Sequence, residues 1–541
     1  MSLYLGLDSS TQSLTAIIVA IEGDERHVVF ESSLSFDEAL PHYSTTHGVL
    51  PRRDPHVATS SPLMWAEALD VMMARVAKSG LDLRQLAGIS GSAQQHGSVY
   101  LNAAWLQAVR ALDASGPLVD QIRGVFAREE SPIWMDSSTA EECAEITARV
   151  GGPDALARRT GSRAFERFTG PQIRRFFKQS PAPYRATVRV HLVSSFLASL
   201  LSGGDAPIDP GDASGMNLMD LASQDWWQDA VDATAPGLRE KLPSIKPSKT
   251  VVGTLSPYWQ SRYGLPAAKV IAWSGDNPCS LIGTGLVREG RVAVSLGTSD
   301  TVFGLMCAPR VDVTGTGHVF GAPTGDYMGL TCFLNGSLAR ERMRNQFGMD
   351  WPAFSHALDS TPPGVHVVLP WFEPEITPAV PLAGARRYGM ANAGANVEVR
   401  ALVDAQMMTM ALHSRWMGVE IDTIHATGGA AANRSILQTM ANVFGATVCQ
   451  FAVSNSAALG AALRAAHADL TARDSAEGWD DVVRGFAEPV ASTRIEPDER
   501  RHGFYRELMQ VYAACEAHAL ENGPDPEPLL ERLRDRVARA G

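Results

Sequence analysis

The sequence contains few cysteines, and no two of them form a CxxC pair. The six lie far apart, at Cys143, Cys279, Cys307, Cys332, Cys449 and Cys515. This scatter argues against a structural zinc site, which needs clustered ligands, and it is typical of a protein in a reducing compartment. We therefore expect a cytoplasmic protein.

Long apolar segments are also missing. Apolar runs such as residues 16–21 are far shorter than the roughly 20 residues that cross a membrane. Residues 1–8 have no basic leader and are interrupted by Asp8, so they do not resemble a signal peptide. The net charge of −12 argues against a general nucleic-acid or anionic membrane surface, although a local phosphate pocket stays compatible with it. We expect neither nucleic acid nor membrane as a partner.

Two common nucleotide-binding fingerprints are absent. We find no GxxxxGK[ST] loop and no GxGxxG sequence that opens a helix. These absences exclude the P-loop and the dinucleotide-binding turn. Any nucleotide bound by this chain must therefore be held by a different arrangement of donors.

Length and composition predict two large domains. The chain has 541 residues, of which 45% are hydrophobic and 20% charged, and this length is too great for a single core. A helical pattern over residues 62–78 leads to an apolar strand pattern over 86–92, and such alternation indicates an α/β fold. We expect domains over residues 1–268 and 269–500, followed by a helical tail over 501–541.

Two distant segments share one pattern: an apolar strand, a tight turn of small residues and a second strand. The first joins residues 3–8 to 13–19, and the second joins residues 291–296 to 301–306. Each is predicted to be a β-hairpin, and the repetition predicts two related domains that face one cleft. Because hairpins are common, two unrelated hairpins are the alternative interpretation.

The turns of both hairpins are suited to phosphate. Small Ser, Thr and Gly residues leave backbone amides and hydroxyls free to surround a polyphosphate. The candidate residues are Ser10, Thr11, Gly297, Thr298 and Ser299. Asp8, at the start of the first turn, would meet a hydrated magnesium ion that bridges phosphates. The alternative role for Asp8 is an Asx-type turn.

Asp276 is predicted to be a general base. It follows an apolar strand pattern over residues 269–273, and Pro278 suits the first position of a helix, so Asn277 is the expected N-cap. A carboxylate one residue before a helix is stabilised by free amides and by the helix dipole. We therefore expect Asp276 to be ionised and able to accept a proton. The alternative is that this turn only caps the helix.

Polar and small residues at other strand ends are candidate ligand contacts. Gln95 and His96 follow a first-domain strand, where hydroxyl-rich ligands are commonly bound, and Arg167 offers donors suited to sugar oxygens or phosphate. Gly429, in a Gly-Gly pair after another strand, leaves room for a flat base or a ribose. The alternatives are a structural histidine, a solvated arginine and a tight turn in which Asn433 caps the next helix.

Eight short motifs, taken in order, resemble those of the FGGY carbohydrate kinases. They are Leu7-Asp8-Ser9-Ser10-Thr11-Gln12, Gln94-Gln95-His96-Gly97, Trp134-Met135-Asp136, Arg167-Phe168-Thr169-Gly170, Ser214-Gly215-Met216-Asn217, Gly275-Asp276-Asn277-Pro278, Ser295-Leu296-Gly297-Thr298-Ser299 and Thr427-Gly428-Gly429-Ala430. The match runs from residue 3 to about residue 470. Eight motifs in the right order are a far more specific signal than any one of them.

The resemblance implies two ribonuclease H-like domains of the actin-type ATPase fold on either side of a catalytic cleft. It also implies transfer of the γ-phosphoryl group of ATP, with Mg²⁺, to the 5-hydroxyl of D-xylulose. The sugar-binding residues by this likeness are Gln95, His96, Arg167, Asp276 and Asn277, with Asp276 as the base. The adenine nucleotide would contact Gly429, Ala430, Asn433 and Trp351.

One turn departs from the family pattern. Ser10 stands where the more usual Asp-x-Gly-Thr sequence has glycine, which bears on the shape of the first phosphate turn. For Asp136 the sequence leaves two roles open: contact with the sugar, or ordering of its own loop.

Three alternatives to a D-xylulose kinase stay open. The first is a kinase of the same family that acts on another ketopentose or on a polyol. An actin-like or heat-shock-type ATPase would share the two hairpins but would not need the Gln-Gln-His and Gly-Asp-Asn motifs. A silent sugar sensor is disfavoured because both Asp8 and Asp276 are present. The expected partners are a small sugar and ATP or ADP, and the assembly state, including a homodimer, stays open.

Overall fold

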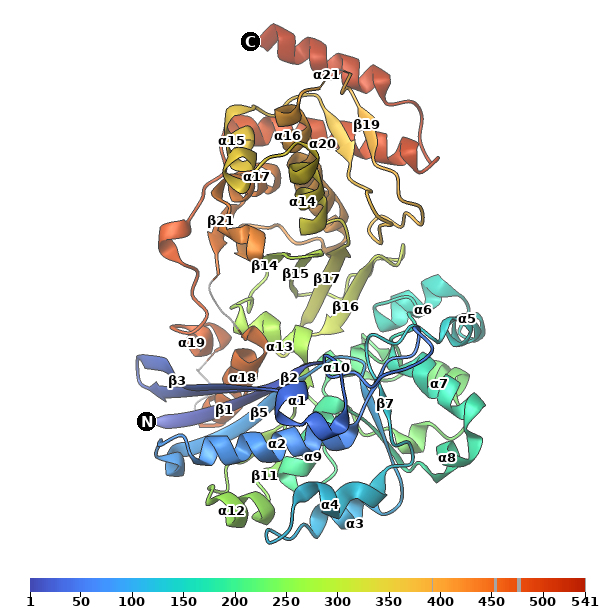
Figure 1. Ribbon diagram of the computed structural model, residues 1–541, viewed down its shortest axis with the longest axis vertical. Coiled ribbons are helices and arrows are strands. Elements are labelled where there is room, and N and C mark those ends of the chain that lie inside the picture. Colours follow the sequence, from blue (N-terminus) through green and yellow to red (C-terminus); the bar gives the residue numbers. More distant parts are fainter. Residues whose placement is uncertain (392, 452–454, 474–477, 541) are drawn as a thin grey trace.

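Two β-sheets, one in each half of the chain, organise the protein. The computed structural model describes residues 1–391, 393–451, 455–473 and 478–540. In Figure 1 the first sheet lies in the lower body and the second sheet in the upper body. Helices cover both sheets, which confirms the predicted α/β fold of two domains.

The first sheet has the strand order β11-β12-β5-β1-β2-β3, and β13 also pairs with β5. Its strands are β1 (Ser2–Ser9), β2 (Ser13–Glu22), β3 (Glu25–Ser35), β5 (Leu86–Ala93), β11 (Val251–Thr254), β12 (Lys269–Ile271) and β13 (Ser274–Gly275). β1, β2 and β3 are antiparallel neighbours, whereas β5 runs parallel to both β1 and β12. The sheet therefore continues past residue 268, where the sequence predicted the domain boundary.

The second sheet repeats this arrangement. Its order is β16-β17-β15-β14-β20-β21. The strands are β14 (Arg291–Leu296), β15 (Asp300–Met306), β16 (Gly317–Gly321), β17 (Tyr327–Phe333), β20 (Thr423–Thr427) and β21 (Thr447–Gln450). β17, β15 and β14 are antiparallel neighbours, and β20 and β21 are added in parallel. In the first sheet, β3, β2, β1, β5 and β12 follow one another with the same relative directions as β17, β15, β14, β20 and β21 in the second. Both predicted hairpins and the predicted relation between the two domains are therefore confirmed.

The remaining elements surround the sheets. Short strands are β4 (Thr59–Ser60), β6 (Ser98–Leu101), β7 (Ser131–Pro132), β8 (Arg189–Leu192), β9 (Met219–Asp220), β10 (Asp225–Trp226), β18 (Val367–Leu369) and β19 (Arg386–Tyr388). Helices up to the middle of the chain are α1 (Phe36–Ala39), α2 (Pro62–Ala77), α3 (Trp105–Arg110), α4 (Leu118–Ile122), α5 (Ala140–Arg149), α6 (Pro153–Thr160), α7 (Thr169–Gln179), α8 (Pro181–Ala186), α9 (Val193–Ser202), α10 (Pro210–Ser214), α11 (Gln228–Thr234), α12 (Pro257–Tyr263) and α13 (Asp276–Gly283). Later helices are α14 (Ser337–Gln346), α15 (Trp351–Ser360), α16 (Ala395–His413), α17 (Arg434–Phe444), α18 (Ser456–Arg473), α19 (Trp479–Val483), α20 (Glu499–Ala519) and α21 (Glu527–Ala540). None of the described helices is both long and apolar enough to cross a membrane.

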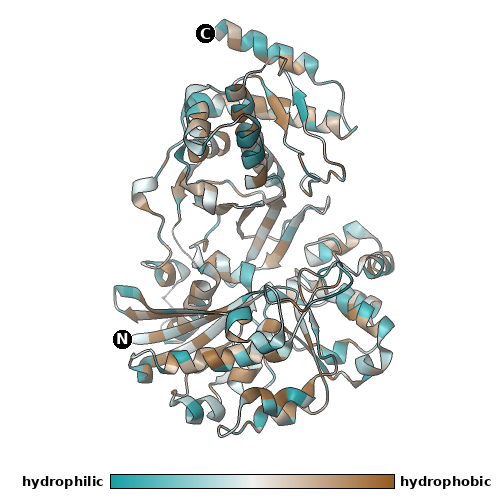
Figure 2. Ribbon diagram, in the orientation of Figure 1, coloured by the Kyte–Doolittle hydropathy of each residue, from teal (hydrophilic) through white to brown (hydrophobic). Residues whose placement is uncertain are grey.

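Helix α2 shows how the sequence pattern produces a packed layer. Pro62 opens the helix, where its missing N–H is not needed. Trp65, Leu69, Met72 and Val76 follow at spacings of three or four, so their side chains share one face and are buried. Figure 2 shows α2 with both hydrophobic and hydrophilic residues. The helix therefore covers the first sheet with one face and meets solvent with the other.

A helix from the second half of the chain covers the first sheet. α18 packs against β1, β2, β5 and α13. The approach is close because it occurs at glycines: a Cβ atom on Gly460 would overlap the carbonyl group of Cys279, and one on Gly6 would overlap the carbonyl oxygen of Ala458. Tyr4 and Leu463 belong to the hydrophobic cluster that forms between the sheet and this helix.

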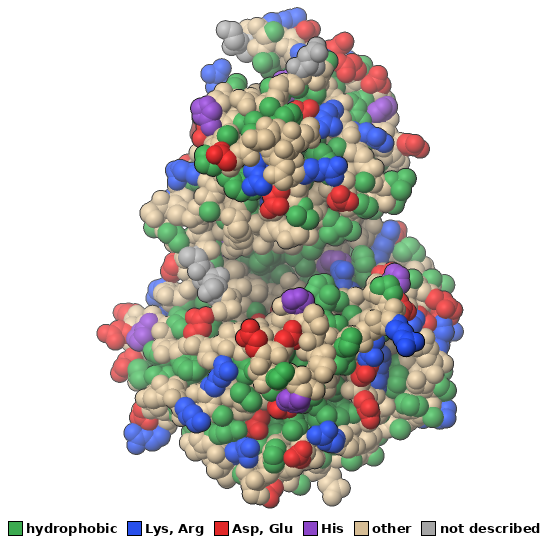
Figure 3. Space-filling view, viewed as in Figure 1, with side chains coloured by type: hydrophobic (Ala, Val, Ile, Leu, Met, Phe, Trp, Pro, Cys, Tyr) green, Lys and Arg blue, Asp and Glu red, His purple; other side chains and the backbone are tan. Residues whose placement is uncertain are grey.

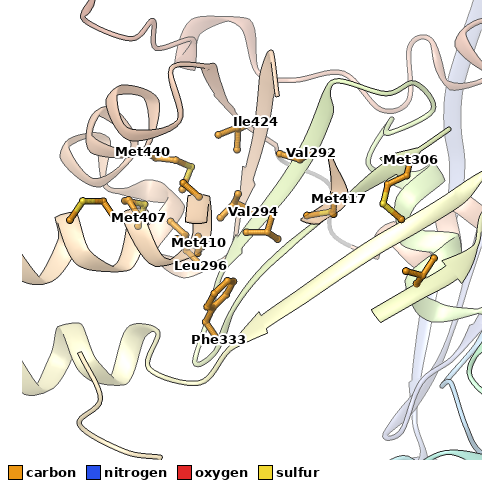
Figure 4. Packing of buried hydrophobic residues seen from close by; sticks show 14 of the residues in the cluster. Val292, Val294, Leu296, Met306, Phe333, Met407, Met410, Met417, Ile424 and Met440 are labelled. Atoms are coloured by element: carbon orange, nitrogen blue, oxygen red, sulfur yellow. The ribbon is translucent and has the colours of Figure 1, made fainter. Parts of the chain in front are cut away.

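The core of the second domain fixes the strand that leads to residues 297–299, the second candidate phosphate turn. Figure 4 shows Val292, Val294 and Leu296 of β14 among methionines of α16 and α17, such as Met407 and Met440. These β14 residues alternate along the strand and so point to one face of the sheet. Their burial holds the end of β14, and therefore the turn that follows it, in a defined position.

The C-terminal segment forms two helices, α20 and α21, where the sequence predicted a helical tail over residues 501–541. The sequence after residue 470 is polar on average, so its composition did not indicate how α20 packs. Tyr505, Leu508 and Tyr512 of α20 are buried against the second domain. Their spacing of three and four residues gives the helix a narrow apolar stripe, which average polarity does not reveal.

Candidate active site

The candidate site residues of the first domain gather where parallel strands end. Asp8 of β1 pairs with Ser92 of β5, and Ser274 of β13 pairs with Ser92 from the other side. The carboxyl ends of the three strands therefore meet. The segments carrying Asp8, Gln95 and Asp276 are neighbours at this edge, where ligands bind in open α/β sheets. Figure 3 shows the surface hollowed between the two bodies above this sheet.

Helix α13 begins at Asp276, and Gly275 is its N-cap. The prediction of Asn277 as the N-cap was therefore wrong, because Ser274 and Gly275 belong to β13 and Asp276 already has a helical backbone. Pro278 occupies the third helical position, where its missing N–H is also tolerated. The backbone amide and side-chain amide of Asn277 donate to Oδ1 of Asp276 at 2.9 and 3.2 Å. Asn277 thus fixes the orientation of the carboxyl group.

Asp276 has a raised pKa, contrary to the prediction of a carboxylate kept ionised by the helix terminus. Burial, followed by the negative charge of Asp8, raises its pKa to about 7. The backbone amide of Asn277 acts in the opposite direction but does not compensate for the loss of hydration. A carboxyl group with this pKa is suited to accept a proton near neutral pH.

Asp8 presents an oxygen with no protein partner. Its Oδ1 atom is buried and accepts no hydrogen bond from the described residues, and the hydroxyls of Ser9 and Ser92 are in the same state. Burial raises the pKa of Asp8 to about 6. Unpaired buried oxygens are costly unless a ligand satisfies them. They fit a hydrated magnesium ion, which takes oxygen ligands from one or two carboxylates and keeps several waters.

The first candidate phosphate turn, which follows β1, is closed by hydrogen bonds of Ser10. The Ser10 amide donates to the carbonyl oxygen of Ser13 at 2.9 Å, and the Ser10 hydroxyl accepts from the Ser13 amide at 3.1 Å. The turn therefore uses the serine hydroxyl at the position where the usual family pattern has glycine. The indole N–H of Trp134 donates to the Thr11 hydroxyl at 2.8 Å and ties this turn to a neighbouring loop.

The second candidate phosphate turn, residues 297–299, is held by hydrogen bonds at both of its ends. The amide of Ser337 donates to the carbonyl oxygen of Gly297 at 2.9 Å. Asp300, directly after the turn, accepts two hydrogen bonds from the buried guanidinium of Arg340, at 2.9 and 3.0 Å. Thr298 itself is exposed. The turn is thus held at both ends while its middle faces solvent.

The two glycines of the Gly-Gly pair differ. Gly428 has φ +86°, and a Cβ atom there would lie 2.6 Å from the carbonyl oxygen of Leu296, so its glycine is required by the fold. Gly429 is exposed, and a Cβ atom there would meet nothing within 4 Å. Ser295 pairs with Thr427 in the parallel sheet, which sets this pair beside the second phosphate turn. Gly429 therefore borders open space next to that turn.

Asn433 links the Gly-Gly turn to helix α15. Its Oδ1 atom accepts from the amides of Ser435 and Ile436 at 3.0 and 3.2 Å, so Asn433 caps α17, the role that the sequence offered as the alternative to a nucleotide contact. Its Nδ2 atom donates to Ser355 of α15 at 2.8 Å. Trp351 is the first residue of that helix and is partly exposed. Gly429, Ala430, Asn433 and Trp351 therefore belong to one connected region of the second domain.

His96 is held as a neutral imidazole. Its Nδ1–H donates to the carbonyl oxygen of Gly215 at 2.7 Å, which leaves Nε2 as the free acceptor. Burial, followed by the charge of Arg167, lowers its pKa to about 3. The backbone of His96 has φ +72°, a left-handed conformation that is uncommon outside glycine. Gly215 thus gives the Ser-Gly-Met-Asn motif a role in orienting His96.

Gln95 connects the first strand end to helix α13. Its Oε1 atom accepts from the side-chain amide of Asn277 at 2.8 Å, and its Nε2 atom donates to the carbonyl oxygen of Gly211 at 3.2 Å. A Cβ atom on Gly275 would overlap the Gln95 side chain, so glycine is required there. The structure therefore brings Gln95, Asn277 and Asp276 into one hydrogen-bonded chain.

Arg167 lies on the same side of the site as His96. Its guanidinium lies 5.1 Å from the ring centre of Phe165 and 5.8 Å from that of Phe168. Phe168 also contacts the His96 ring at a centroid distance of 4.7 Å. Burial lowers the pKa of Arg167, and His318 lies within 3.4 Å of its Nη2 atom. The guanidinium thus packs against aromatic rings, and no carboxylate among the described residues pairs with it.

Asp136 orders its own loop. Its Oδ2 atom accepts from the Ala58 amide at 3.0 Å, and its Oδ1 atom accepts from the amide of Ser138 at 3.0 Å and from Gln172 at 2.7 Å. The side chain is only 2% exposed. Both oxygens are used by protein donors, so the structure favours the second of the two roles that the sequence left open.

Two further polar residues lie near the site: Gln94, which belongs to one of the quoted motifs, and His318, which the sequence interpretation missed. Both polar atoms of the Gln94 side-chain amide are buried and have no partner among the described residues. Its neighbours in sequence were singled out, so that motif contained a signal for it. His318, on β16, contacts Arg167 from the second domain. No local motif marks His318, because only the tertiary fold brings it to this place.

The fold and much of the chain match known proteins. Models of the FGGY family of carbohydrate kinases match residues 129–283 with the N-terminal domain and residues 292–468 with the C-terminal domain. Xylulose kinase of Mus musculus is 41% identical over 536 residues, which cover 96% of this chain and 95% of the relative. Xylulose kinase 2 of Arabidopsis thaliana is 41% identical over 518 residues, which cover 91% and 90%.

Solved structures show the same two-domain fold. Xylulose kinase from Rhodospirillum rubrum aligns with a TM-score of 0.78 at 22% identity, over 96% of this chain and 99% of that one. Plasmodium falciparum glycerol kinase with ADP aligns with a TM-score of 0.75 at 17% identity, over 95% and 98%. These structures confirm the fold class, and the family models and relatives define the family. The chain belongs to the FGGY family of carbohydrate kinases.

Proposed function

We propose that this kinase transfers the γ-phosphoryl group of ATP to the 5-hydroxyl of D-xylulose, giving D-xylulose 5-phosphate and ADP. The choice of sugar is supported by the 41% identity with two xylulose kinases over nearly the whole chain. The chemistry is supported by one observation above the others. A carboxyl group with a pKa near 7, Asp276, lies at the strand ends beside Asp8.

Asp276 would act as the general base. Its carboxylate accepts the proton of the attacking hydroxyl as the phosphoryl group moves, and Asn277 holds the carboxyl group in a fixed orientation. Phosphoryl transfer needs little else from a protein beyond positioning and charge neutralisation. The shared hydrogen bond between Asn277 and Gln95 couples the base to the rest of the sugar site.

The sugar would be held by side chains at the strand ends of the first sheet and at the start of α13. Neutral His96 offers its Nε2 atom as an acceptor for a hydroxyl, and Arg167 offers several donors for sugar oxygens. Gln95 and Asn277 supply amide groups at the end nearer to Asp276. This combination of acceptors and donors suits a neutral, hydroxyl-rich ligand better than an anion.

The nucleotide and its metal would lie across the two sheets. Asp8 would hold a hydrated magnesium ion, which neutralises the phosphate charge when it is bound. The turns with Ser10, Thr11, Gly297, Thr298 and Ser299 would surround the phosphates. Gly429, Ala430, Asn433 and Trp351 would hold the adenosine, with Gly429 presenting bare backbone to it. We also propose a cytoplasmic location, which is supported by six cysteines that are all unpaired.

A coupled ADP-release assay tests the proposal. The protein is incubated with Mg-ATP and a panel of ketoses and polyols, with the Asp276→Asn variant as a matched control. We expect D-xylulose to give the highest kcat/KM and the variant to be nearly inactive with every sugar. A higher kcat/KM for another ketopentose or a polyol would reassign the substrate. Equal ADP production with and without every sugar would favour an ATPase instead.

A further inference from the structure

The edge strand β16 of the second domain brings a buried histidine, His318, to the proposed sugar site. Figure 1 shows β16 extending from the upper body towards α6 and α10 of the lower one. The amide of Val319 on this strand donates to the carbonyl oxygen of Gly161 at 3.0 Å, so the strand is joined to the loop that follows α6. His318 is only 6% exposed at this junction.

Both ring nitrogens of His318 have partners from the first domain. Nδ1 lies 3.0 Å from the hydroxyl of Ser162, and Nε2 lies 3.4 Å from Nη2 of Arg167. An arginine can only donate, so Nε2 must accept and the ring proton must be on Nδ1, where it points to Ser162. Burial, and then the charge of Arg167, lowers the pKa of His318 to about 3, in agreement with a neutral ring.

The Ser-Gly-Met-Asn motif of the first domain holds Ser162 in place beside His318. Asn217, the last residue of the Ser-Gly-Met-Asn motif, donates to the carbonyl oxygen of Ser162 at 3.0 Å and to the Thr160 hydroxyl at 2.6 Å. This pins the backbone of Ser162 and therefore its hydroxyl. The hydrogen-bonded chain runs from Asn217 through Ser162 and His318 to Arg167.

Arg167 has no stronger side-chain partner to orient it. Its only hydrogen bond to a side chain in the described part of the protein is the one to His318. Phe165 and Phe168 lie against the guanidinium and restrict its plane, but a ring face does not select which N–H points where. Phe165 also contacts the His318 ring edge-on, at a centroid distance of 5.0 Å. The imidazole is therefore the group that sets the direction of the arginine donors.

We infer that His318 is a positioning residue for sugar binding, contributed by the second domain, which aims the guanidinium of Arg167 at the substrate. The inference rests on the proposed function, in which Arg167 contacts the sugar. Its consequence is that the sugar site is shared: the first domain supplies the contacts, and the second domain sets the orientation of one of them. Loss of the acceptor at residue 318 then weakens the sugar complex without touching the nucleotide.

The test compares two substitutions of one residue. His318→Phe keeps a planar ring but removes both polar atoms, and we expect it to raise the KM for D-xylulose about tenfold. His318→Gln keeps an oxygen that accepts from Arg167 and an N–H that donates to Ser162, and we expect it to restore most of the affinity. ADP affinity and kcat should change less than twofold in both variants. His191→Phe, which removes another buried histidine with two partners, is the control for general destabilisation.

A double-mutant cycle identifies the route of the effect. If His318 acts through Arg167, His318→Phe adds little to the rise in KM that Arg167→Met causes alone. Additive effects, or a loss of ADP affinity equal to the loss of sugar affinity, would overturn the inference. An unchanged KM in His318→Phe together with a raised KM in Arg167→Met would overturn the inference about His318 but would leave the proposed sugar site in place. An unchanged KM in Arg167→Met would overturn both it and the proposed sugar site.

Discussion

Asp8 and Asp276 flank the end of strand β5, and the charge of Asp8 adds to burial in raising the pKa of Asp276. The two carboxyl groups have different surroundings. Asp8 has a buried oxygen that no described residue satisfies, whereas Asn277 donates two hydrogen bonds to Asp276. Two neighbouring carboxyl groups in distinct environments can divide metal binding and proton transfer between them.

The first prediction concerns Asp276 as the base. Asp276→Asn keeps the size of the side chain but cannot accept a proton, so we expect kcat to fall by at least about a hundredfold. ADP affinity should stay within about twofold of wild type, because the nucleotide side of the site is untouched. Steady-state kinetics and calorimetric ADP titration measure the two quantities. A near-normal kcat would leave Asp276 with only a structural role.

The second prediction concerns stability and pH. The pKa of Asp276 is about 7 in the folded protein and 3.8 without its environment, so the folded state binds more protons between these values. The contribution of this group to stability is therefore largest below about pH 4 and is lost as the pH rises to 7. An asparagine side chain does not ionise, so the Asp276→Asn variant does not lose this stability as the pH rises. We expect the variant to melt roughly 1–4 °C above wild type at pH 8, measured without magnesium or ligands, and this advantage should vanish at about pH 4.

A melting temperature of Asp276→Asn below that of wild type at pH 8 would contradict the second prediction. It would mean that the helix-terminal charge stabilises the fold more than burial opposes it. The matched control is Asp209→Asn, because Asp209 is fully buried near the same strand ends but accepts hydrogen bonds from Ser248 and Ser274. Loss of those bonds should lower the melting temperature over the whole pH range.

The third prediction concerns His96. The backbone there is left-handed, a conformation that asparagine adopts more readily than alanine does. We therefore expect His96→Asn to fold normally while raising the KM for D-xylulose by about tenfold or more, with ADP affinity unchanged. His96→Ala should show the same loss of sugar affinity together with a lower melting temperature. An unchanged sugar KM with weaker ADP binding would reverse the assignment of the two sides of the site.

The fourth prediction separates the two adjacent glycines. Gly429 borders open space, so Gly429→Leu should leave the melting temperature within about 2 °C of wild type while weakening ADP binding by at least about tenfold. Gly428→Ala should instead destabilise the fold, because φ is positive and the added methyl group meets Leu296. Thermal melts and ADP titrations of both variants measure these two effects. Unchanged ADP binding by folded Gly429→Leu would remove this turn from the nucleotide site.

Local sequence patterns predicted the parts of this fold that depend on neighbours in the chain. The hairpins and α2 follow from apolar periodicity, and the cap of α17 follows from Asn433. The start of α13 was missed by two residues because proline is compatible with any position of the first helical turn. The pKa of Asp276 could not be predicted, since it depends on burial in the folded protein and on the charge of Asp8, 268 residues earlier in the chain. His318 could not be predicted either, because only the tertiary fold brings it next to Arg167.

The packing of α18 on the first sheet also determines when that sheet can be completed during synthesis. One apolar face, which includes Tyr4, Ile17 and Val19, is covered by α18 and α19 from the far end of the chain. Until those helices leave the ribosome, this face has no native cover and exposes hydrophobic residues to solvent or to chaperones. The first domain by sequence is therefore among the last parts of the protein to finish folding.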